Sequence, residues 1–153
     1  MMKMVKSNIL VFLLSLVAIS ANAQVVTTDP AFPTETGSVT ITFDATEGNG
    51  ELEGFTGEVY LYTGVITNQS TSSSDWKYVK PSVSSGWSTY PETLKATSLG
   101  NGKWEFTYSP SVREFFGVTN TDEKIEQISV LFRGTNDGTG NPDRVGRGEG
   151  SGE

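Results

Sequence analysis

Hydrophobic and polar residues alternate with a period of two in much of the chain, the pattern of a β-strand with one buried face. In the clearest run, Val39, Ile41 and Phe43 alternate with threonines. A second run, over residues 103–108, places Trp104 on the apolar side. We therefore expect two half-buried strands here, with Trp104 in the core.

Four further strands are predicted, each bounded by residues that favour turns. Gly100, Asn101 and Gly102 form a tight-turn signal between two of the strands, because glycine tolerates positive φ. Pro81 ends another, because proline has no N–H for a sheet ladder. These predicted strands cover residues 58–63, 76–80, 94–99 and 126–133.

One short helix is predicted over residues 109–117. Ser109 suits the N-cap, Pro110 suits the first helical position and Gly117 suits the end. Many short strands with polar turns and a single helix predict an all-β fold, an immunoglobulin-like antiparallel β-sandwich. A lipocalin-like or other barrel is the alternative.

The two flanks of this β-sandwich module, residues 37–133, differ from it in composition. Residues 24–36 contain two prolines and few periodic apolar residues, so we expect an extended lead-in. Residues 134–153 are rich in glycine and contain no hydrophobic run. We expect this tail either to be disordered or to be truncated before a final strand, so that the sequence is a fragment.

The amino terminus has the three parts of a secretory signal peptide. Lys3 and Lys6 supply a basic region, residues 9–19 are apolar, and an A-x-A site ends at Ala23. We expect residues 1–23 to be cleaved after Ala23 and the protein to be secreted, extracellular or at a periplasmic or cell surface. A retained membrane anchor is the alternative, but no stop-transfer pattern follows.

Charge and composition exclude several function classes. The chain has a formal charge of −7, and loss of two lysines with the leader gives −9. This disfavours nucleic acids and anionic membranes as partners, and it suits a neutral or cationic ligand. With no histidine and no cysteine, the usual general base and thiol nucleophile are missing, so we expect neither an enzyme nor a cofactor. Asp137 and Asp143 are weak candidates for calcium ligands.

Aromatic residues supply the candidate binding site. Because Val59 and Leu61 are expected to face the core, Tyr60 and Tyr62, which alternate with them, are expected to point outward. Trp76 and Tyr78 either join them or belong to the core of a second sheet, and Trp87 lies in a loop where we expect exposure. Exposed aromatic rings stack on the apolar faces of sugars, while neighbouring polar groups bind the hydroxyls. The candidate ligand-binding residues are Tyr60, Tyr62, Trp76, Tyr78, Trp87 and Lys77.

Six runs of residues are distinctive, namely 41–49, 57–67, 73–80, 99–105, 111–117 and 130–133. Together they resemble a β-sandwich module of secreted bacterial proteins of starch and glycan utilisation, often found ahead of an α-amylase-type domain. A more distant similarity is to starch-binding carbohydrate-binding modules of family 26. There a Tyr-x-Tyr strand followed by a tryptophan stacks on α-glucan, and Tyr60, Tyr62 and Trp76 match this arrangement.

The resemblance implies a non-catalytic module that holds α-glucan or a related polysaccharide, covalently linked to a glycoside hydrolase domain. It also implies a final strand after the acidic, glycine-rich segment. The alternative is a structural or interaction domain that docks a neighbouring catalytic domain and buries the aromatic residues in that contact.

Overall fold

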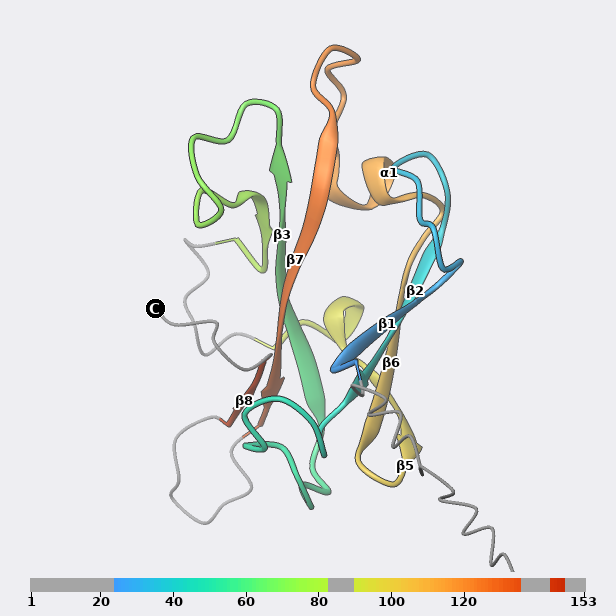
Figure 1. The fold of residues 1–153 in the computed structure, drawn as a ribbon, viewed down its shortest axis with the longest axis vertical. Coiled ribbons are helices and arrows are strands. Elements are labelled where there is room, and N and C mark those ends of the chain that lie inside the picture. Colours follow the sequence, from blue (N-terminus) through green and yellow to red (C-terminus); the bar gives the residue numbers. More distant parts are fainter. Residues whose placement is uncertain (1–23, 83–89, 136–143, 148–153) are drawn as a thin grey trace, which may run out of the picture.

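The computed structural model describes residues 24–82, 90–135 and 144–147. Two antiparallel four-stranded sheets face each other around a common core (Figure 1). The predicted all-β sandwich is confirmed, and the described residues contain one short α-helix. Trp104 lies in the core, only 3% exposed, as its alternating strand predicts.

The first sheet has the strand order β1-β2-β6-β5. Its alternating strands behave as predicted, with Val39, Ile41 and Phe43 buried and the residues between them half-buried. The segment expected as an extended lead-in, residues 24–36, supplies β1, which pairs with β2 and belongs to the sandwich. The strands are β1 (Val26–Asp29), β2 (Val39–Asp44), β6 (Lys103–Tyr108) and β5 (Thr97–Gly100).

The second sheet has the order β4-β3-β7-β8. Its last strand lies in the glycine-rich tail, where the sequence shows no hydrophobic run. The strand reaches the core at Gly146, where the backbone itself lies against core side chains. An added Cβ there would lie 2.4 Å from Cζ of Phe43 and 2.8 Å from Cδ1 of Leu52. Gly146 therefore packs on the core through its bare backbone. The strands are β4 (Lys77–Lys80), β3 (Val59–Thr67), β7 (Ile125–Gly134) and β8 (Val145–Gly146).

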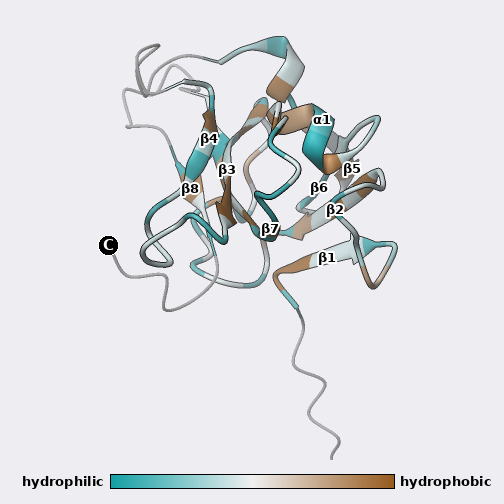
Figure 2. Ribbon diagram, turned by 90° about the horizontal axis from the view of Figure 1, so that it is seen from above, coloured by the Kyte–Doolittle hydropathy of each residue, from teal (hydrophilic) through white to brown (hydrophobic). Residues whose placement is uncertain are grey.

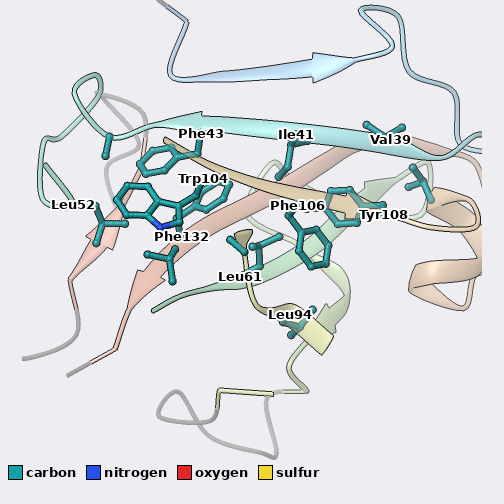
Figure 3. Close-up of a cluster of buried hydrophobic side chains, with 14 of the residues drawn as sticks. Val39, Ile41, Phe43, Leu52, Leu61, Leu94, Trp104, Phe106, Tyr108 and Phe132 are labelled. Atoms are coloured by element: carbon teal, nitrogen blue, oxygen red, sulfur yellow. The ribbon is translucent and has the colours of Figure 1, made fainter. Parts of the chain in front are cut away.

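The core between the sheets contains stacked aromatic rings (Figure 3). It also contains a buried contact between two hydroxyl groups. The rings of Phe43 and Phe132 stack with centroids 4.4 Å apart, joining the two sheets. Near the other end, the hydroxyls of Tyr108 and Thr63 are 3.0 Å apart, and Thr63 also donates to the carbonyl oxygen of Ser129. This contact satisfies polar groups that are fully enclosed.

The helix α1 (Val112–Phe116) covers one end of the sandwich, and Figure 2 shows that it has both hydrophobic and hydrophilic parts. Val112 and Phe116 are buried against the core. The N-cap is Ser111, not Ser109 as expected. Ser111 is extended, and its hydroxyl accepts a hydrogen bond from the backbone N–H of Glu114. The predicted end is correct, because Gly117 takes a left-handed conformation.

Candidate functional site

Tyr60 and Tyr62 follow the predicted alternation of β3, whose Val59 and Leu61 belong to the core. The two tyrosines therefore point to the outer face of the second sheet. Their surroundings on that face differ. Tyr60 is only 3% exposed, whereas Tyr62 is half-buried.

Tyr60, which was expected to offer an exposed ring for stacking, is buried in this structure. Its hydroxyl lies 3.0 Å from a carboxylate oxygen of Glu58 and 2.9 Å from one of Glu92, and its single proton serves one at a time. Tyr90 packs against its ring with centroids 5.4 Å apart, and the Lys95 ammonium lies 5.9 Å from the ring centroid. Burial, followed by these hydrogen bonds, raises the pKa of Tyr60. The ring of Tyr60 is therefore covered by Tyr90, Glu92 and Lys95, which lie far from it in the sequence.

Tyr62 and Trp76 remain together on the outer face. Both are half-buried, and their ring centroids are 6.1 Å apart with an angle of 34° between the ring planes. Gly64 makes this approach possible, because a Cβ there would lie 3.3 Å from Cβ of Trp76 and 3.0 Å from the carbonyl oxygen of Lys77. The choice that the sequence left open is thereby settled: Trp76 lies over β3 and not in the core between the sheets.

Tyr78 leaves this face, contrary to the expectation that it would join Trp76. Its φ of 54° breaks the strand alternation, and the pairing of β3 with β4 shifts register at the same place. As a result Val79, instead of Tyr78, lies with Trp76 beside Gly64.

The hydroxyl of Tyr78 donates to Glu123 over 2.7 Å. Thr67 donates to the other carboxylate oxygen of Glu123 over 2.8 Å. These hydrogen bonds, that of Tyr78 first, lower the pKa of Glu123. Tyr78 therefore ties β4 to the loop before β7, which is a structural role.

A charged pair flanks Trp76 in the sequence. The ammonium of Lys77 lies 3.0 Å from the carboxylate of Asp75, and both side chains are about one-third exposed. Two hydrogen bonds lower the pKa of Asp75: the larger effect comes from the backbone N–H of Thr71, and the smaller one comes from the ammonium of Lys77. The ionised pair is fixed near the rings and keeps accessible donor and acceptor atoms, as hydrogen bonding to hydroxyl groups requires.

Three candidates, Trp87, Asp137 and Asp143, lie outside the described residues. Within the described part of the chain, no group of three or more acidic side chains is placed to hold a metal ion. No helix in that part is long and apolar enough to cross a membrane. The predicted leader, residues 1–23, is not described.

Two residues that shape the site were missed from the sequence. Gly64 allows Trp76 to approach β3, and an isolated glycine within a strand pattern is a known sign of close backbone approach. Glu123 holds Tyr78 away from the face, and nothing in its sequence neighbourhood signals this. No known protein-family model matches the chain, and no curated protein matches its sequence.

Proposed function

We propose that this chain is a non-catalytic module that binds a neutral polysaccharide by stacking sugar rings on Tyr62 and Trp76. The polysaccharide that we favour is α-glucan. The observation that carries the proposal is the pair of half-buried rings, 6.1 Å apart, on the outer face of the second sheet. A flat aromatic side chain offers an apolar face to a pyranose ring and loses little conformational freedom on binding.

The angle between the rings favours a curved ligand. With 34° between their planes, Tyr62 and Trp76 suit successive sugars that change orientation, as in an α-1,4-linked chain, better than a flat β-1,4-linked ribbon. The pair of Lys77 and Asp75 supplies polar atoms for the hydroxyls. A net charge of −7 is compatible with an uncharged ligand.

Retention on insoluble starch, cellulose and chitin tests this function. We expect retention on starch, and about fivefold weaker retention for Trp76→Ala and for Tyr62→Ala, since one aromatic contact contributes roughly 1 kcal/mol. The matched control is Phe32→Ala, because Phe32 is 91% exposed and lies outside the ring pair. The proposal fails if wild type is not retained on any of the three polysaccharides, or if folded Trp76→Ala is retained as well as wild type.

An interaction domain that docks a neighbouring catalytic domain is the second candidate. It is favoured by Leu131, which is half-buried and pairs with Tyr62, and by Val79 beside Gly64, since both extend the ring pair into an apolar patch. Aromatic residues within such patches are frequent anchors of protein interfaces. Absence of retention on every polysaccharide, together with binding of a separate catalytic domain that Trp76→Ala abolishes, would favour this candidate.

A further inference from the structure

The two sides of the sandwich are closed differently. On one side, the chain passes from the second sheet to the first through residues 91–96, with Leu94 buried and the N–H of Ala96 bonded to the carbonyl oxygen of Val59. On the other side, β8 pairs only with Phe132 and Arg133 of β7. Among the described residues, no strand pairs with residues 125–131 of β7 along this edge.

A groove of about 230 Å³ lies where this closure is missing, between β1 and β7. Its walls are largely apolar. Four of its residues pack against the core yet are only partly buried, namely Val26, Ile125, Ile128 and Val130. The groove is therefore an opening of the hydrophobic core, and its apolar walls would gain stability from being covered.

The edge of β7 that is unpaired within the described part of the chain continues the ladder that β8 begins. The N–H of Gly134 donates to the carbonyl oxygen of Arg144, and Phe132 pairs with Gly146. In an antiparallel ladder, every second residue directs its N–H and C=O to the same neighbour. Stepping by two from Phe132 reaches Val130 and then Ile128, so their backbone groups face the groove and can bond an added strand.

We propose that this groove binds an extended strand of a second polypeptide, which pairs antiparallel with β7 in line with β8 and inserts apolar side chains at alternate positions. The unpaired ladder supplies main-chain hydrogen bonds, and the apolar walls select the inserted side chains. Exposed Glu126 at the groove favours basic residues at the outward positions of that strand.

Two other occupants fit less well. Residues 148–153, Gly-Glu-Gly-Ser-Gly-Glu, contain no apolar side chain, so even a backbone ladder with them would leave the apolar walls of the groove uncovered. The β7 strand of a second copy already directs its apolar side chains into its own core, and two copies that each carry −7 repel one another. A free, extended segment with alternating apolar residues meets both requirements.

Amide hydrogen exchange with a synthetic peptide tests the proposal. The probe is the acetylated and amidated peptide KVTIKVT, whose apolar residues alternate. We expect it to slow exchange at Ile128 and Val130 about tenfold or more, because a new ladder would protect these amides. The control peptide KKVIVTT has the same composition without alternation, and we expect it to leave exchange unchanged.

Two further arms separate pairing from nonspecific adhesion. Methylation of alternate amides in KVTIKVT should abolish protection on wild-type protein, which avoids any effect on folding. Val130→Lys should abolish it too, whereas Thr97→Lys on exposed β5 should not. No slowing at millimolar peptide, equal slowing by the control or the methylated peptide, or protected groove amides in a peptide-free dimer would each overturn the proposal.

Discussion

The side-chain amide of Asn49 donates to the carbonyl oxygen of Val145 over 2.7 Å, joining residues 96 positions apart. The same side chain accepts a hydrogen bond from the N–H of Arg147, and the N–H of Asn49 donates to the carbonyl oxygen of Arg147. Asn49 therefore takes the place of a neighbouring strand. It holds the outer edge of β8, while β7 pairs with the inner edge.

Loss of this side chain should release β8. We expect Asn49→Ala to remove the side-chain partner of two backbone groups, the carbonyl of Val145 in β8 and the N–H of Arg147 just after it, at a cost of roughly 1–2 kcal/mol to the local opening free energy. The amide of Gly134, which is bonded to the carbonyl oxygen of Arg144, should then exchange about tenfold faster. Exposed Gln69→Ala serves as the control. Unchanged exchange at Gly134 in Asn49→Ala would show that β7 alone holds β8.

The strands that could be predicted are those whose own residues alternate. β2 and β6 have a clean period of two, and Trp104 follows from it. β8 could not be predicted in this way, because its contact with the core is made by Gly146 and its edge is held by Asn49. Neither contact leaves a hydrophobic signal near β8 in the sequence.

For the candidate site, the sequence predicts which way the side chains of β3 point, but not which of them are covered. Alternation in β3 sets the direction of Tyr60 and Tyr62, but not what covers them. Tyr60 is enclosed by residues that follow 30 or more positions later, among them Tyr90 and, at a sequence separation of 32, Glu92. Tyr78 departs from the alternation through a positive φ, which β-strand propensity does not predict.

The buried contact between Tyr108 and Thr63 should contribute to stability. Tyr108 is fully buried, and burial raises the pKa of its hydroxyl. We expect Tyr108→Phe to lower the free energy of unfolding by about 1–2 kcal/mol, because Thr63 loses one partner while its bond to Ser129 remains. Urea denaturation followed by tryptophan fluorescence measures the change. An unaltered midpoint would mean that the contact contributes nothing net.

The ion pair of Asp44 with Lys103 should make stability depend on pH. Hydrogen bonds from Lys103, and then from Thr46, lower the pKa of Asp44 from 3.8 to about 2. Since the pKa is lower in the folded state, the carboxylate stabilises the fold above about pH 4, and this stabilisation is lost as the pH falls toward 2. Because the pair is partly exposed, we expect it to contribute on the order of 1 kcal/mol.

The measurement for this pair is the free energy of unfolding of wild type and Asp44→Asn from pH 7 to pH 2. The two proteins should differ by about 1 kcal/mol at pH 7 and converge near pH 2. Asp122→Asn, at an exposed position, should follow wild type throughout. A constant difference at every pH would assign the effect to packing or to Thr46 instead of to ionisation.

Gly64 offers a way to move Trp76 without removing it. A Cβ at this position would lie 3.0 Å from the carbonyl oxygen of Lys77 and 3.2 Å from Cγ2 of Val79, so β4 would have to shift by a few tenths of an ångström. We expect Gly64→Ala to fold with a loss of roughly 1 kcal/mol, to change the near-ultraviolet circular dichroism of the ring pair, and to weaken retention on starch several-fold.

The control for this displacement is Thr97→Ala on the exposed strand β5, which belongs to the other sheet and not to the sheet of the ring pair. It should change neither the dichroism nor the retention. If Gly64→Ala altered the dichroism but bound starch as wild type does, the spacing between Tyr62 and Trp76 would not matter for binding. Stacking on the pair as a unit would then be replaced by stacking on one ring alone, because only a two-ring contact depends on how the rings lie relative to each other.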